Sequence, residues 1–209
     1  MAQAARLGRP AGVDGEQTRR RIMAAATEHV AEVGYGNATM KTIAERAGLT
    51  SAAIYRYFPT KQELVGVIFD ELVQEIMGRL ERATQVPGTL QERFVSLLEE
   101  SLACTRDHPA AARLSEAVHL ESARIPEFHA VIDGRVRTEE EIYTRLVDDA
   151  IRRGELPADA DRQAIADMLT SLIWGLTRLG ATVPRARHAA AIRQVEGLLA
   201  SGSLLPRSG

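Results

Sequence analysis

The 209-residue sequence has only one cysteine, Cys104, and no long uninterrupted run of apolar residues. A single cysteine excludes an intramolecular disulfide and a zinc site built from several cysteines. The apolar segment from Leu169 to Leu176 is interrupted by Ser171 and Gly175, and it is shorter than the roughly 18 to 20 residues that cross a bilayer. The N-terminus lacks the apolar core of a signal peptide. We therefore expect a cytoplasmic protein without membrane association, in which Cys104 is a buried apolar thiol.

The sequence also lacks the alternating apolar and polar residues of a half-buried strand, and it has no internal repeat. We find no glycine-rich phosphate loop and no nucleophile elbow. Apolar residues make up 45% of the chain and charged residues 26%, which is ordinary for a globular protein. Apolar residues recur instead at helical spacing. We expect an all-α fold without catalytic residues or a cofactor.

Charge is distributed unevenly along the chain. Residues 1–61 carry nine Lys and Arg against five Asp and Glu, whereas the remaining chain carries 17 against 23. The basic end is therefore the expected nucleic-acid end. A helix predicted over 61–83 has an apolar stripe so wide that it must be buried on two sides, which makes it the link between two domains. The predicted divisions are a flexible basic arm (1–15), a three-helix domain at the basic end (16–62), a larger helical domain (63–201) and a frayed tail (202–209).

Two short helical patterns are separated by a tight turn in the basic domain. Thr39 is placed to cap the first, and Gly48 ends it because a residue without a Cβ reverses the chain at little cost. Thr50 caps the second pattern, which is predicted over Ser51–Phe58. In this helix Ile54 and Phe58 lie four residues apart and face the core. Such a helix, held outward by its neighbours, is suited to the major groove of DNA.

The run from Ile43 to Leu49, the cluster Tyr55-Arg56-Tyr57-Phe58 and the helix start Lys61-Gln62-Glu63-Leu64 resemble the TetR family of bacterial one-component transcriptional regulators. The resemblance extends over roughly residues 16–70 of this sequence. It implies a homodimeric, all-helical, ligand-responsive repressor with an N-terminal helix-turn-helix domain and a C-terminal domain that binds a small molecule.

The resemblance also implies which residues contact an inverted-repeat, double-stranded DNA operator. Hydroxyl and ammonium groups suit phosphate oxygens, and these contacts fall to Thr39, Lys41, Thr50, Tyr55, Tyr57 and Lys61. Base contacts fall to Ser51, Ala52, Ala53 and Arg56. Two alanines and a serine read bases weakly, so we expect Arg56 to supply the main guanine contact. Arg6 and Arg9 of the arm are candidates for reading minor-groove width, the alternative being a solvated tail.

Two further sets of residues follow from the implied architecture. The first could line an effector pocket or simply fill the core, with His119 and Trp174 as polar handles: Met77, Phe94, Leu114, Val118, His119, Phe128, Tyr143 and Trp174. We expect a mostly apolar effector. The second lies on the last two predicted helices, about 159–180 and 186–201, which by resemblance form a four-helix bundle with a second copy: Leu169, Leu172, Ile173, Leu176, Ile192, Val195 and Leu199.

Three alternatives accompany this interpretation. Glu116 and His119 have the spacing of a di-iron ligand pair, but a ferritin-like site needs a second such pair, so we expect no metal. A helical enzyme or ligand carrier with a scaffold-only N-terminal bundle requires a catalytic pair, which the sequence does not offer. A DNA-binding activator controlled by a protein partner stays open.

Overall fold

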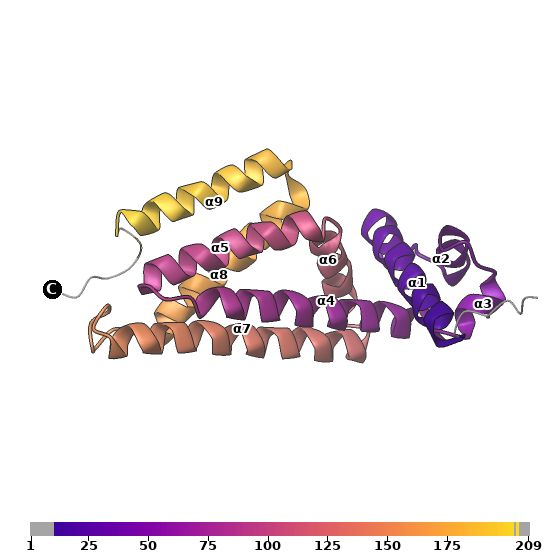
Figure 1. Cartoon of the computed structure of the whole chain (residues 1–209), viewed down its shortest axis with the longest axis horizontal. Coiled ribbons are helices and arrows are strands. Elements are labelled where there is room, and N and C mark those ends of the chain that lie inside the picture. The colour runs from indigo at the N-terminus through magenta and orange to yellow at the C-terminus, as the bar shows by residue number, and fades with distance from the viewer. Residues whose placement is uncertain (1–10, 203, 205–209) are drawn as a thin grey trace, which may run out of the picture. The chain divides into compact units, whose positions relative to one another are not determined.

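The computed structural model describes residues 11–202 and 204, and within them all regular secondary structure is α-helical, as predicted. The helices are α1 (Ala11–Val33), α2 (Met40–Arg46), α3 (Ser51–Tyr55), α4 (Lys61–Thr84), α5 (Leu90–Asp107), α6 (Ala111–Glu121), α7 (Pro126–Arg152), α8 (Arg162–Thr182) and α9 (Arg185–Ala200) (Figure 1). Across the described part of the chain, no helix is both long and apolar enough to cross a bilayer. The chain divides into two compact units between Ile68 and Phe69, and α4 runs through this boundary.

The first unit is a small helical cluster built on α1. Its helix begins at Ala11, earlier than predicted, so residues 11–15 extend the helix and do not belong to an irregular arm. The arm residues Arg6 and Arg9 lie outside the described residues, as does most of the predicted tail. The core is formed by side chains from every helix of this unit, all at most 3% exposed: Ile22, Ala26, Val30, Ile43, Ala44, Ile54, Phe58, Leu64 and Val65.

The second unit is a helical body in which α8 packs against α6, α7 and α9, while α5 packs against α9 (Figure 1). Pro126 starts α7, because its fixed φ suits the first helical turn. Leu80, Phe94, Tyr143 and Leu169 belong to one apolar core. Burial of the Tyr143 hydroxyl raises its pKa well above the usual range. This core holds the helices that surround the cavity described below.

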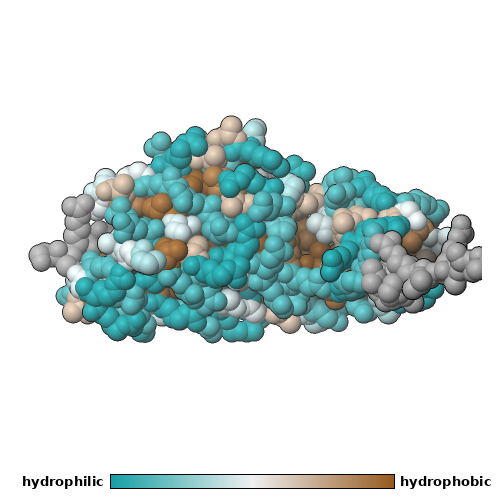
Figure 2. Space-filling view, in the orientation of Figure 1, coloured by the Kyte–Doolittle hydropathy of each residue, from teal (hydrophilic) through white to brown (hydrophobic). Residues whose placement is uncertain are grey.

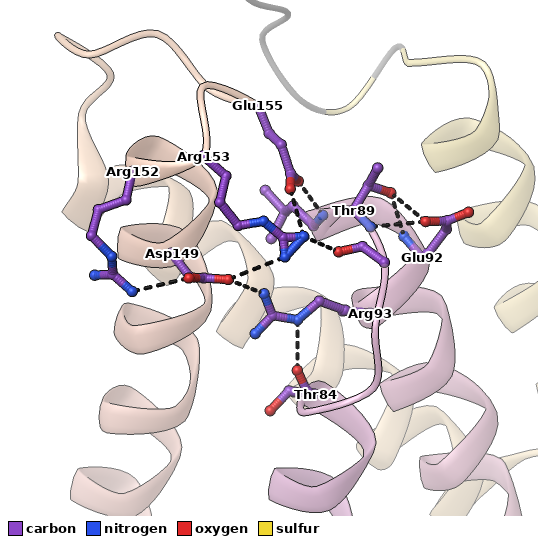
Figure 3. Close-up of polar contacts among 10 residues, drawn as sticks. Thr84, Thr89, Glu92, Arg93, Asp149, Arg152, Arg153 and Glu155 are labelled. Atoms are coloured by element: carbon purple, nitrogen blue, oxygen red, sulfur yellow. Dashed lines mark hydrogen bonds and ion pairs between the residues drawn. The ribbon is translucent and has the colours of Figure 1, made fainter.

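A polar network fastens one end of this body (Figure 3). Arg93 of α5 donates from Nε to the carbonyl of Thr84 at 2.6 Å, and its guanidinium pairs with the carboxylate of Asp149 on α7. The Arg93 guanidinium lowers the pKa of Asp149. Glu155 accepts a hydrogen bond from the backbone N–H of Leu90 at 2.5 Å. The network therefore joins the end of α4 and the start of α5 to the end of α7.

Candidate DNA interface and effector cavity

The two short helices of the first unit are capped at the predicted residues. Thr39 Oγ1 accepts from the N–H of Thr42 at 3.2 Å, and the N–H of Thr39 donates to Thr42 Oγ1 at 3.3 Å. Thr50 Oγ1 accepts from the N–H of Ala53 at 3.2 Å. Gly48 has φ +66°, the left-handed conformation that favours glycine. The caps and this turn set the directions of α2 and α3.

Helix α3 divides its side chains between the core and the surface. Ile54 is fully buried and Phe58 is 3% exposed, so they hold the segment onto the unit. Ser51 and Ala52 are exposed, and Tyr55 is 52% exposed. The first turn of α3 thus presents small side chains and a phenolic hydroxyl outward, as a helix that enters a DNA groove must.

Helix α3 is shorter than predicted, because it ends at Tyr55 and not at Phe58. Arg56 occupies the C-cap position and donates its backbone N–H to the carbonyl of Ala53 at 3.3 Å. Its exposed guanidinium lies over the ring of the half-buried Tyr57, 5.6 Å from the centroid. Arg56 therefore projects from the end of α3 with its guanidinium supported on an aromatic ring.

Lys61, a predicted phosphate contact, is engaged inside the first unit. Its Nζ donates to the carbonyl of Tyr35 at 2.6 Å and to that of Ala38 at 2.8 Å. The ammonium also lies 4.1 Å from the centroid of the Tyr35 ring. An ammonium has three donors, and two of them are taken by these carbonyls. The structure thus gives Lys61 the role of joining α4 to the segment before α2, which the sequence did not reveal.

Two residues of α1 contact the ends of α2. Arg21 donates from Nη2 to the carbonyl of Ala47 at 2.5 Å, next to the turn at Gly48. The buried imidazole of His29 lies 2.9 Å from Thr42 Oγ1 through its Nε2 atom. Because Thr42 belongs to the capping box of α2, α1 contacts both ends of that helix. Part of the basic charge of this unit is therefore used for internal support.

The ten predicted DNA contacts within residues 39–61 fall into two groups by exposure. The exposed residues are Thr39, Lys41, Thr50, Ser51, Ala52, Tyr55 and Arg56. The half-buried residues are Ala53, Tyr57 and Lys61. The exposed group brings hydroxyl, ammonium and guanidinium groups together around α2 and α3.

The second unit contains a cavity of about 80 Å³. One wall is an apolar face of α4, formed by Phe69, Leu72, Val73, Ile76, Met77 and Leu80. Side chains of the other helices line the remaining walls, among them Cys104, His108, Ser115, Arg135, Glu139, Ile173 and Thr177. The lining is therefore largely apolar with a small set of polar groups, which is typical of a small-molecule site.

The polar groups at the cavity are connected in what we call the Arg135 cluster: Ser115, Arg135, Glu139 and Trp174. Arg135 donates from Nε to Glu139 Oε1 at 3.0 Å and from Nη1 to Ser115 Oγ at 3.1 Å. Trp174 Nε1 donates to the other carboxylate oxygen of Glu139, which is 1% exposed. A buried carboxylate is stable here because a cation and an indole N–H satisfy it. Among the described residues, no group of three or more His, Cys, Asp or Glu side chains could hold a metal ion.

Cys104 is the cavity's only thiol. Burial raises its pKa to about 11, so it stays protonated near neutral pH. The nearby guanidinium of Arg79 is paired with Glu100 at 2.5 Å and Asp107 at 2.8 Å. The thiol is thus an apolar part of the lining, in agreement with its expected burial.

Comparison with known proteins agrees with these features. The family described as "Bacterial regulatory proteins, tetR family" matches residues 22–68, and "Tetracyclin repressor-like, C-terminal domain" matches residues 86–196. The chain belongs to the TetR family. It is therefore a DNA-binding transcriptional regulator and not an enzyme, as the sequence predicted.

The chain is similar to several regulators, with which it shares about a quarter of the aligned residues. The HTH-type transcriptional regulator TtgR of Pseudomonas putida is 26% identical over 180 residues, covering 82% of this chain and 83% of TtgR. The HTH-type transcriptional regulator UidR of Escherichia coli is 25% identical over 165 residues, covering 78% of this chain and 81% of UidR. The solved structure of Salmonella enterica GusR superposes with a TM-score of 0.68 at 25% identity, covering 96% of this chain and 99% of GusR.

The predicted effector residues of this TetR-family regulator are placed in three ways. Met77 lines the cavity. His119 is exposed and faces away from the core, and Trp174 is 43% exposed and reaches the cavity only through its bond to Glu139. The other predicted residues fill the core at no more than 1% exposure and do not line the cavity: Phe94, Leu114, Val118, Phe128 and Tyr143.

The residues predicted for the dimer interface mostly belong to the protomer's own core. Five of them are at most 7% exposed: Leu169, Ile173, Leu176, Ile192 and Leu199. Leu172 and Val195 are half-buried. The apolar stripes of α8 and α9 pack against other helices of the same chain. The surface that α8 and α9 leave exposed carries Ser171, Trp174, Gly175, Gln194, Gly197 and Leu198.

The sequence contained a signal for the Arg135 cluster that we did not use. Along α7 the buried positions Phe128, Ile132, Ile142 and Leu146 follow a helical spacing of three and four residues. Arg135 and Glu139 stand at the positions between them. Opposite charges four residues apart within an apolar stripe indicate a buried ion pair beside a cavity or core.

Proposed function

We propose that this regulator is a dimeric repressor that binds an inverted-repeat operator and is released by a small, mostly apolar effector. The observation that carries this proposal is the first turn of α3, where Ser51, Ala52 and Tyr55 are exposed while Ile54 is fully buried. A short helix anchored in this way exposes its outer face to the major groove. We further propose that the protein acts in the cytoplasm, where its operator lies.

Phosphate contacts supply most of the affinity in this proposal. Thr39, Lys41 and Thr50 are exposed around the N-terminal ends of α2 and α3, where hydroxyl and ammonium groups can bind phosphate oxygens. Few side chains make base-specific contacts, because Ala52 offers only a methyl group. Arg56, exposed beyond the end of α3, supplies the main guanine contact. Lys61 acts by supporting α4 and does not reach the phosphates.

Dimerisation uses the exposed surface of α8 and α9. Gly175 and Gly197 allow close approach of helices, and the exposed side chains of Trp174 and Leu198 supply apolar area. Figure 2 shows apolar areas in the region of α9 as well as elsewhere on a mostly polar face. A two-fold pair then holds two copies of α3 about 34 to 36 Å apart, one turn of B-DNA.

The effector acts on α4. The cavity of about 80 Å³ is smaller than the roughly 300 to 1,000 Å³ of drug-sized ligand sites, so a bound effector must displace part of its lining. Helix α4 supplies the apolar wall of the cavity and, through Lys61, is bonded to the first unit. Displacement of α4 changes the position of α3. A coupling of about 1 to 3 kcal/mol lowers operator affinity by roughly 5- to 150-fold.

The DNA interface is tested by fluorescence anisotropy with DNA from the region upstream of the regulator's own gene. Ala52→Glu places a negative charge on the exposed face of α3 and is expected to weaken binding by more than about tenfold, because like charges across an interface cost several kcal/mol. Ala123→Glu, at an exposed position of the second unit, is the matched control and should bind normally. Normal binding by Ala52→Glu excludes α3 as the reading helix. Loss of repression in a promoter fusion on deletion of the gene distinguishes a repressor from an activator.

The dimer surface and the arm have separate tests. Leu198→Glu is expected to give monomers in sedimentation velocity, whereas Leu120→Glu, on α6 and 76% exposed, should leave the dimer intact. A dimer formed by Leu198→Glu contradicts the proposed surface.

Deletion of residues 1–10 tests Arg6 and Arg9: unchanged operator affinity at physiological salt rules out a minor-groove contact.

A further inference from the structure

The charges around the cavity define the chemical class of the effector. We infer that the effector is an uncharged, mostly apolar molecule whose hydrogen-bond acceptor, such as a ketone or ester oxygen, faces the Arg135 guanidinium. This inference rests on the proposed function, because it concerns the ligand of the same cavity. It adds the charge and hydrogen-bonding character of that ligand, and it names Arg135 as the side chain that selects it.

The cavity carries no net charge that an ionic effector could balance. Arg135 is paired with Glu139 at 3.0 Å. Cys104 stays protonated, and His108, which also lines the cavity, has its Nε2 atom 3.0 Å from Glu75. An anionic effector would therefore add a negative charge beside a guanidinium that is already neutralised. Burial of an unpaired charge is strongly unfavourable, which disfavours an anion.

A cationic effector is disfavoured by the geometry of Glu139. One of its carboxylate oxygens accepts from Arg135 and the other from Trp174. The side chain is only 2% exposed, so an ammonium group could approach it only by displacing one of these donors. The ammonium would also lie beside the positive charge of Arg135. Glu139 thus balances Arg135 and does not act as a receptor for cations.

Arg135 keeps donors for a neutral acceptor. A guanidinium has five N–H groups. The hydrogen bonds of Arg135 to described residues use Nε and one N–H of Nη1, for Glu139 and Ser115. The remaining N–H groups belong to a side chain that lines both the cavity and an adjacent groove between α4 and α7. A hydrogen bond from a charged donor to a neutral oxygen adds affinity without an unpaired charge.

A matched set of ligands tests the inference on the full-length protein without DNA. Acetylnaphthalene is a neutral acceptor, ethylnaphthalene has the same shape without an acceptor, naphthoate is an anion and naphthylmethylammonium is a cation. Ligand binding is measured by isothermal titration calorimetry, with the fluorescence of Trp174, the only tryptophan, as a second signal. Acetylnaphthalene is expected to bind at least about tenfold more tightly than the other three, the usual effect of one hydrogen bond to a charged group.

Substitution of Glu139 should reverse the preference for charge. Glu139→Gln keeps the shape of the side chain but leaves Arg135 unbalanced, so naphthoate should become the tightest ligand. Glu140→Gln, exposed on the same helix, is the matched control and should keep the wild-type order. Ser115→Ala frees one more N–H of Arg135 without changing charge, so acetylnaphthalene should remain the tightest ligand and naphthoate should stay disfavoured. Circular dichroism melting shows whether each variant folds. If Glu139→Gln does not fold, the order of ligand affinities of the wild type decides the test.

The outcomes separate this inference from the proposed switch. Equal or tighter binding of ethylnaphthalene, naphthoate or naphthylmethylammonium to the wild type overturns the inference, as does a folded Glu139→Gln protein that still prefers acetylnaphthalene. Failure of all four ligands to bind also overturns it. Binding of acetylnaphthalene without release of the operator contradicts the switch and supports the effector class.

Discussion

The two units of this regulator use charged side chains in different ways. In the first unit, Arg21 and Lys61 reach backbone carbonyls and hold short helices in place. In the second, Arg135 and Glu139 pair with each other beside an apolar cavity. The first arrangement links short helices to neighbouring segments of their own unit. The second places a balanced pair of charges beside the cavity, so the contrast lies in whether a cation is bonded to backbone carbonyls or paired with a carboxylate at a cavity.

The largest expected effect is on the stability of the second unit. Arg135→Met leaves Glu139 buried without its cation, and breaking a buried pair in this way costs about 3 to 5 kcal/mol. The double variant Arg135→Met with Glu139→Leu should recover most of this loss, because no charge stays buried. Urea unfolding measures both. Equal stability of the single variant and the wild type would show that the pair is hydrated and that the contrast between the units is false.

A second prediction concerns the core of the first unit. Ile54→Ala removes a fully buried side chain beneath α3 and is expected to destabilise that unit by about 2 to 5 kcal/mol and to abolish operator binding. Leu169→Ala, a matched loss in the second unit, should cost a similar amount while operator affinity below the unfolding temperature is retained. The measurements are thermal unfolding and DNA anisotropy. Retained operator binding by Ile54→Ala contradicts the role of this core.

A third prediction compares two lysines of the DNA-binding unit. Lys41→Gln should reduce the slope of log affinity against log salt by about 1, because one phosphate contact is lost. Lys61→Gln should leave this slope unchanged and lower the melting temperature, since its ammonium bonds Tyr35 and Ala38. Salt titrations of operator binding distinguish them. A reduced slope for Lys61→Gln would restore it as a phosphate contact.

The smallest effect is a pH dependence in the second unit. Burial lowers the pKa of His188, which is 2% exposed and packs against Gly180. Below the unfolded pKa of about 6.5, the unfolded chain binds a proton that the folded protein does not, so stability falls as pH decreases until the lowered folded pKa is passed. Urea unfolding between about pH 8 and about pH 5 should show this decrease, and His188→Gln should flatten it. An unchanged dependence in His188→Gln assigns the effect to other groups.

Most helices could be predicted from the sequence, because their signals are local. Thr39, Thr50 and Gly48 mark the helix-turn-helix within a few residues of the bonds that they make, and Pro126 starts α7 in the same way. The start of α1 was missed, and so was the early end of α3. Both lie where helical dihedral angles continue or stop without a strong cap or breaker.

The sites depended on contacts that local patterns do not show. The apolar spacing in α8 predicted buried residues such as Leu169 correctly but did not indicate what would cover them. The covering surface is formed by other helices of the same chain, and it leaves exposed a more polar face that includes Leu198. The cavity was likewise predicted to use Phe94 and Tyr143, which fill the core, because burial and cavity lining have the same periodicity.

The sequence by itself determined the family, the helical fold and the outward turn of α3, because caps, turns and helical periods act between residues close along the chain. Only the tertiary structure decided that Lys61 donates to the carbonyls of Tyr35 and Ala38. It also decided that Trp174 of α8 donates to Glu139 of α7. Hydrogen bonds between distant residues depend on the packing of whole helices, which apolar patterns permit in several ways. The tertiary structure therefore decided which polar groups of this regulator face its cavity.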